Sequence, residues 1–193
     1  MSHFAWYKSV KGPGVLGPRG WHCFGTYGSS GATLYLSPES LNSKLVFSDD
    51  WKGFAGPAIE ISSMDGGTSG RFEVARNIAR LFPSHIEFTH QVIAEGIEPA
   101  NNFPYGPYPH DKLTYKTKTL VDFETAAHHE GLGTQSRLQA NTEPIIGFVF
   151  LSAQPNDDPY DISLEIRLPA DMAWLSPTIR DATEQTLPAE PAK

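Results

Sequence analysis

The sequence predicts one α+β domain, mostly antiparallel β-sheet, with one main amphipathic helix at 71–82 and a short C-terminal helix. Two observations support this fold class. Roughly seven short segments have the alternating or apolar character of β-strands, whereas only one long segment has helical periodicity. The 193 residues contain no repeat or linker and suit one domain of ordinary size. We therefore expect a single domain at 1–187 and a flexible tail at 188–193.

The first third of the chain is rich in glycine and turn residues. We expect 1–31 to be irregular and strands to form at 32–37 and 43–48, joined by a turn at 38–42. A further strand is predicted at 58–64. The irregular segment carries five aromatic residues that we expect to anchor it: Trp6, Tyr7, Trp21, Phe24 and Tyr27.

The helix at 71–82 is predicted by its apolar stripe and ends at Pro83. The alternation over 85–94 then favours a strand. The apolar stripe consists of Phe72, Ala75, Ile78, Ala79 and Phe82, and the opposite, polar face consists of Glu73, Arg76, Asn77 and Arg80.

The second half of the chain contains three more predicted strands, at 111–124, 143–152 and 161–169. The last two are expected to form a hairpin, and a short helix should begin with Ser176 as N-cap and Pro177 as its first residue. Lys112, Lys116 and Lys118 indicate a solvated or edge strand. The strand at 161–169 should turn Ile162, Leu164, Ile166 and Leu168 inward and Ser163, Glu165 and Arg167 outward.

Composition excludes several classes of protein. The net charge of −7 argues against general nucleic-acid binding, and Cys23, the one cysteine, cannot form an intrachain disulfide. No apolar run is long enough to span a membrane, and the N-terminal sequence has no apolar core of a signal peptide. Few lysines and many glycines, prolines and tryptophans slightly favour an extracytoplasmic location. No cofactor is predicted.

The most informative motif is the turn that precedes the main helix. Gly66, Gly67, Thr68, Ser69 and Arg71 could bind an anion, because a helix N-terminus presents unpaired N–H groups and Arg71 is a cation placed at the positive end of the helix dipole. Alternatively the turn is structural, Thr68 or Ser69 caps the helix and Arg71 pairs with an acidic neighbour. The segment lacks the P-loop pattern and misses the nucleophile-elbow pattern.

This strand, Gly-Gly turn and helix are loosely similar to the oxyanion-hole segment of Clp-type serine proteases and crotonases. The similarity covers a small part of the chain. The serine that those proteases place on a later helix has no counterpart in 91–110, so no catalytic residue is carried over.

Cys23 is a second candidate site, because a thiolate with a suitable base is a nucleophile. Its neighbour His22 should point to the opposite face of an extended chain, and Cys23 could equally be a small buried hydrophobic residue. His128 and His129 are weak candidates for metal ligands, together with His85 and Glu87, and the HExxH pattern is absent.

The leading hypothesis is a non-catalytic binding or interaction domain whose contact surface lies on the long loops 95–111 and 125–142. Phe103, Tyr105 and Tyr108 would bind a protein, peptide or glycan partner, or they could simply cover the core. The alternative is a hydrolase or acyl-transfer enzyme with Cys23 or Ser69 as nucleophile and the Gly66-Gly67 turn as oxyanion donor.

Overall fold

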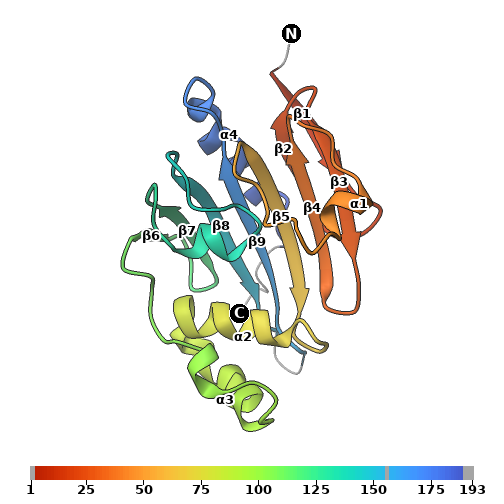
Figure 1. The fold of residues 1–193 in the computed structure, drawn as a ribbon. Helices are drawn as coiled ribbons and strands as arrows, with labels where there is room; N and C mark the ends of the chain where they lie inside the picture. The colour runs from red at the N-terminus through yellow and green to blue at the C-terminus, as the bar shows by residue number, and fades with distance from the viewer. Residues whose placement is uncertain (1–2, 155–156, 189–193) are drawn as a thin grey trace.

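An antiparallel sheet forms the centre of the molecule (Figure 1), and over the described residues its seven strands have the order β3-β4-β5-β9-β8-β7-β6. The structure is a computed structural model that describes residues 3–154 and 157–188. Strands β5 and β9, far apart in the sequence, are neighbours at the middle of the sheet. The strands are β3 (His22–Tyr27), β4 (Gly31–Ser37), β5 (Ala58–Asp65), β6 (Asp111–Tyr115), β7 (Leu120–Thr125), β8 (Ile145–Ser152) and β9 (Tyr160–Arg167).

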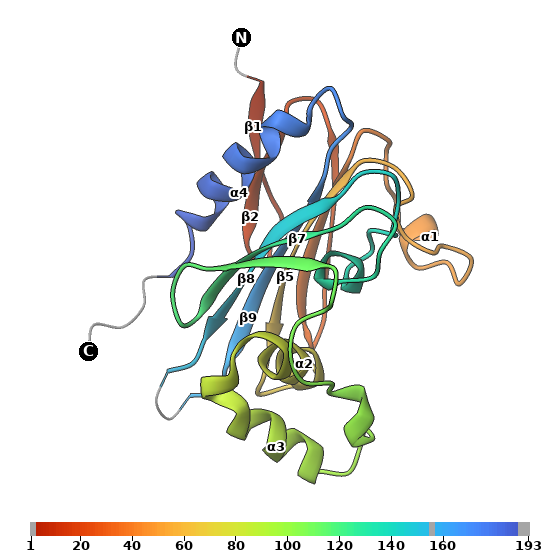
Figure 2. The same ribbon diagram turned by 90° about the vertical axis from the view of Figure 1, so that its left-hand side faces the viewer.

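Both faces of the sheet are covered (Figure 2). One face carries the hairpin of β1 (Phe4–Lys8) and β2 (Gly14–Pro18) together with α4 (Ser176–Glu184). The other face carries α2 (Arg71–Leu81) and the loop around 132–138, and α3 (Ile86–Ala94) packs against α2. The chain is thus a single α+β domain with one longer helix and a short C-terminal helix, as predicted.

The face of the sheet beneath α4 is apolar. Alternate residues of β4, β5, β8 and β9 point toward α4 and β2, which is the inward pattern predicted for 161–169. This cluster includes Leu34, Leu36, Ile59, Ile61, Phe148, Phe150, Ile162, Leu164, Ile166, Leu168 and Ile179.

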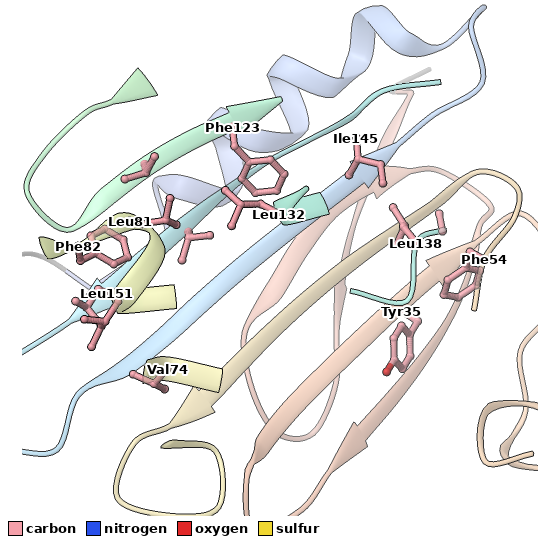
Figure 3. Close-up of a cluster of buried hydrophobic side chains, with 14 of the residues drawn as sticks. Tyr35, Phe54, Val74, Leu81, Phe82, Phe123, Leu132, Leu138, Ile145 and Leu151 are labelled. Atoms are coloured by element: carbon pink, nitrogen blue, oxygen red, sulfur yellow. The ribbon is translucent and has the colours of Figure 1, made fainter. Parts of the chain in front are cut away.

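The face beneath α2 is apolar only at its two sides (Figure 3). Phe123, Leu132 and Ile145 gather over β7 and β8, whereas Tyr35 and Phe54 lie toward β4. Between these two groups, β5 and β9 present polar side chains. Ser163, Glu165 and Arg167 do point away from the apolar cluster beneath α4, but the prediction that this side faces outward is wrong. Helix α2 and the loop 132–138 cover it and leave Glu165 and Arg167 buried.

Two predicted strands are helices. Residues Ser43–Val46 form α1, whose N-cap Asn42 accepts a hydrogen bond from the backbone N–H of Leu45 at 3.1 Å. The segment predicted as a strand at 85–94 forms α3, and Thr89 donates its hydroxyl proton to the carbonyl of Ala75 at 2.9 Å. Short apolar runs fit both periodicities, and packing against α2 selects the helix.

Three other predictions of local structure are wrong. The segment 1–31 contains β1, β2 and β3 instead of irregular chain, and 111–124 is the hairpin β6–β7 instead of one strand. Lys116 lies in the turn of that hairpin, where it pairs with Asp122 at 3.1 Å, although β6 is indeed an edge strand. Ser176 is the first residue of α4 and not its N-cap.

Some predictions fall on residues that the structure does not describe. Residues 189–193 of the predicted tail and residues 155 and 156 of the predicted β8–β9 turn lie outside the described residues. None of the helices in the described chain combines the length and the apolar character needed to cross a membrane.

Arg167 ties the loops beside the sheet to β9. Its guanidinium donates to the carbonyls of Phe54 at 2.6 Å and Gly56 at 2.6 Å, and also to the carbonyl of Gln139. Phe54 and Leu138 form a β-bridge, so the two segments that Arg167 contacts are also paired with each other. The loop that covers the polar centre of the sheet is positioned by this contact.

We predict that Arg167→Lys lowers the free energy of unfolding by about 3 kcal/mol, because the carbonyls are reached from two different guanidinium nitrogens and the single nitrogen of lysine cannot occupy both positions, which leaves buried acceptors unpaired. Urea denaturation measures the change. The matched control Lys112→Ala removes an exposed charge on β6 and should cost less than about 0.5 kcal/mol. Equal stability of Arg167→Lys and the wild type would contradict this role.

Candidate functional site

The glycine-rich turn before α2 uses its N–H groups within the chain. Gly66 donates to the carbonyl of Pro159 at 2.8 Å, and Gly67 donates to Oδ1 of Asp65 at 2.9 Å. The N–H of Thr68 donates to the carbonyl of Asp65 at 3.2 Å. The N–H groups of Gly66, Gly67 and Thr68 are thus already hydrogen-bonded within the chain.

The side chains of this turn are also engaged. Arg71 donates through Nε to Oε2 of Glu95 at 2.8 Å and through Nη1 to the carbonyl of Thr68 at 2.8 Å. The hydroxyl of Ser69 lies 3.2 Å from that of Ser29. Gly70 is the N-cap of α2 and no side chain caps the helix, so the predicted cap at Thr68 or Ser69 is wrong. Arg71 pairs with an acidic neighbour, as the structural interpretation of the turn expected.

Cys23 is exposed on β3, so its interpretation as a buried hydrophobic residue is wrong. It pairs with Leu36 in the strand register, and Leu36 points into the cluster beneath α4. His22 has the opposite orientation along the strand, as expected. Cys23 therefore faces the side of the sheet that carries α4.

The three aromatic residues of the loop 95–111 do not form one surface. Phe103 is buried against Ala75 and Val92, whereas Tyr105 is 59% exposed. The ring of Tyr108 lies beneath the guanidinium of Arg80, with Cζ 3.6 Å from the ring centroid.

The two adjacent histidines point to different surroundings. His129 stacks on His110 with ring centroids 3.8 Å apart, and His128 is exposed with a positive φ of 63°. Within the described part of the chain, no group of three or more His, Cys, Asp or Glu residues is arranged to hold a metal ion.

A site that the sequence did not indicate lies at the polar centre of the sheet. A cavity of about 350 Å³ opens on the face beneath α2, above β4, β5 and β9, and the loop 132–137 forms one of its walls. Ligand sites in proteins commonly have volumes of this order. Its lining is mostly polar: Thr33, Tyr35, Glu60, Ser62, Met64, Glu73, Asn77, Leu132, Gln135, Ser136, Arg137, Val149, Asp161, Ser163 and Glu165.

The strand register explains why carboxyl groups meet in this cavity. Glu60 of β5 lies directly opposite Glu165 of β9, and Ser62 lies opposite Ser163. The two serine hydroxyls are 3.0 Å apart. Because side chains alternate along a strand, Asp161 points to the same face as Glu165. Three buried carboxyl groups therefore share one surface.

These carboxyl groups are unequally satisfied. Glu60 accepts a hydrogen bond from the backbone N–H of Arg137 at 2.7 Å, and Asp161 accepts one from Nδ2 of Asn77 at 2.7 Å. In contrast, Oε2 of Glu165 is buried and has no hydrogen-bond partner among the described residues. Such an atom costs free energy until a donor reaches it.

Burial favours the neutral form of these groups. It raises the pKa of Glu60 to about 7 and the pKa of Asp161 to about 7, and it raises the pKa of Glu165 well above the usual range, where the charge of Glu60 adds to the effect. Burial and the charge of Glu60 also raise the pKa of the Tyr35 hydroxyl to about 12. The cavity thus holds protons near neutral pH, and a cation would displace them.

Comparison with protein-family models, curated proteins and solved structures finds no match to this chain. What the cavity can bind is therefore argued from its own residues. A signal for it exists in the sequence, since Glu60 and Ser62 on one strand and Ser163 and Glu165 on another alternate with apolar residues. Period-two alternation identifies a polar face, but it does not distinguish a solvated face from one that other elements cover.

We predict that the protein loses stability as the pH rises through about 7. The folded-state pKa values of Glu60 and Asp161, about 7, exceed the usual values of 4.5 and 3.8. Between the unfolded and the folded pKa values, the folded state binds more protons than the unfolded state, so the free energy of unfolding falls with increasing pH. The stabilising protonation is complete below the unfolded pKa values and is lost above about 7.

Glu60→Gln tests this prediction by urea denaturation at pH 5 and pH 8.5. The variant should lose less stability between the two values than the wild type, by an amount on the order of 2 kcal/mol. Glu124→Gln, on an exposed side chain of β7, should behave like the wild type. An identical loss in wild type and Glu60→Gln would show that Glu60 does not hold the proton.

Proposed function

We propose that this chain is a non-catalytic binding domain that holds a small polar molecule in the cavity above β4, β5 and β9. The observation that carries the proposal is the unpartnered, buried Oε2 of Glu165 in the wall of a cavity of about 350 Å³. A ligand with a hydrogen-bond donor would satisfy this atom. Without such a donor, no hydrogen bond offsets the free-energy cost of burying this oxygen.

The cavity relates the proposal to the two long loops. The loop 125–142 contributes Leu132, Gln135, Ser136 and Arg137 to its wall. The loop 95–111 contributes Asn102, Pro104 and Tyr108 to a smaller cavity of about 90 Å³, which also includes Gln135 and Leu132. The loop 125–142 thus lines the proposed site, whereas the loop 95–111 lines a second cavity that shares Leu132 and Gln135 with it. A bound molecule would contact the loop 125–142 from inside the cavity instead of on an outer aromatic surface.

The placement of the alternative nucleophiles favours binding over acyl transfer. Neither Cys23 nor Ser69 lines the cavity. An acyl-transfer mechanism needs a nucleophile, a base and oxyanion donors around one substrate atom. The N–H of Gly66 is already bonded to the carbonyl of Pro159 and that of Gly67 to the side chain of Asp65.

We predict that Gln135→Trp abolishes ligand binding. Gln135 is exposed and lies in the wall of both cavities, so an indole there would obstruct them without disturbing the core. A thermal-shift screen of small polar amines, alcohols, sugars, amino acids and carboxylates measures binding. A ligand at 100 times its Kd adds about 2.7 kcal/mol, which corresponds to a rise in Tm of about 5–10 °C for a domain of this size.

Two alanine variants provide controls. Tyr105→Ala removes an exposed ring that lines neither cavity, and it should leave binding unchanged. Tyr108→Ala removes a ring that lines only the smaller cavity, so binding in the larger cavity should persist. If Gln135→Trp retains full binding, or if Tyr105→Ala abolishes it, the cavity is not the binding site.

A further inference from the structure

The cavity is strongly acidic. Glu60 from β5, Glu73 from α2, and Asp161 and Glu165 from β9 face it, against one cationic side chain, that of Arg137. Glu73 lies at the rim, where it pairs with Arg76 at 3.0 Å. None of the three buried carboxyl groups forms an ion pair with another described residue. The ion pairs of the described residues involve other side chains. An excess of carboxyl groups over cations is suited to a positively charged ligand.

We propose that the ligand carries a primary ammonium group, which enters beside the directly opposed Glu60 and Glu165 and donates to Oε2 of Glu165. This inference rests on the proposed function. An ammonium has three donors and no acceptor, so it can serve several carboxylate oxygens at once. No donor from the part of the chain that the structure describes reaches the buried Oε2 of Glu165, and this atom gives the acidic cluster a defined point of contact.

An organic amine fits the cavity better than a metal ion. Across the part of the chain that the structure describes, no three His, Cys, Asp or Glu side chains converge on one point as metal ligands do. The cavity also has apolar walls at Met64, Leu132 and Val149. A short alkyl chain attached to the ammonium would contact these walls while its charged end meets the carboxyl groups.

Binding of the cation is coupled to proton release. In the empty cavity the carboxyl groups retain protons, because they are buried and repel one another when charged. When an ammonium ion enters, a carboxylic acid transfers its proton to solvent and becomes the carboxylate that pairs with the cation. Apart from this O–H bond, whose proton is taken up by solvent, no covalent bond changes. The other groups that face this pair are Tyr35 from β4, Glu73 and Asn77 from α2, and Arg137 from the loop 132–137.

Calorimetric titration with n-butylamine, n-butanol and n-butyrate tests the inference, since these probes share one alkyl chain and differ in the end group. At pH 7 the amine should bind at least about tenfold more tightly than the alcohol, and butyrate should not bind. Amine affinity should rise between pH 6 and pH 8, by up to about tenfold per pH unit for one released proton. Titration in buffers of different ionisation enthalpy measures that proton.

Glu165→Gln retains the shape of the side chain and should weaken amine binding at least about tenfold, while Glu124→Gln should not change it. Glu60→Gln, at the residue directly opposite Glu165, gives an independent variant should Glu165→Gln fold poorly. Equal affinity for butylamine and butanol, or unchanged amine binding in both cavity variants, would overturn the ammonium assignment and leave the binding function standing. If none of these probes and none of the compounds in the wider screen binds at a site that Gln135→Trp blocks, both proposals fail.

Discussion

The register between β5 and β9 is the constraint on which the rest of this structure depends. It sets Ile59 opposite Ile166 on one face and Glu60 opposite Glu165 on the other. A slip of one residue would turn the carboxyl groups into the apolar cluster beneath α4 and the isoleucines into the cavity. The apolar face therefore fixes the register, because burial of its side chains is the larger stabilising effect. The acidic face follows from that choice.

Arg167 positions the loop that forms one wall of the cavity above these strands. It is the next residue after Glu165 on the same face, and its guanidinium holds the carbonyls of Phe54, Gly56 and Gln139. The loop thus held also supplies the N–H of Arg137 that hydrogen-bonds to Glu60. Strand β9 therefore contributes both the carboxyl group of Glu165 and, two residues further, the guanidinium of Arg167, which positions the loop above it. The cavity and its cover depend on the same backbone.

Sequence patterns predicted the fold class because strong periodicity survives in any context. The stripe of α2 and the inward face of 161–169 are set by local alternation that tertiary packing only reinforces. The segment 85–94 was predicted as a strand because its apolar spacing fits two periods, and only contact with α2 through Thr89 and Val92 selects the helix. The site escaped prediction for a related reason. Asn77 and Glu165 lie on polar faces, and nothing in a single strand or helix shows that another element covers such a face.

A domain of this size could place leucine or valine at the centre of its sheet, and doing so would remove the cost of burying carboxyl groups. The cost is confined to one surface, since the opposite face of β5 and β9 is apolar. Glu60 and Asp161 accept hydrogen bonds from Arg137 and Asn77, whereas no donor among the described residues reaches Oε2 of Glu165. A destabilising group that faces a cavity is a common feature of sites shaped for a ligand, where function opposes maximal stability. The proposed cation would pair with these carboxylates, and its binding would then stabilise the folded sheet by mass action.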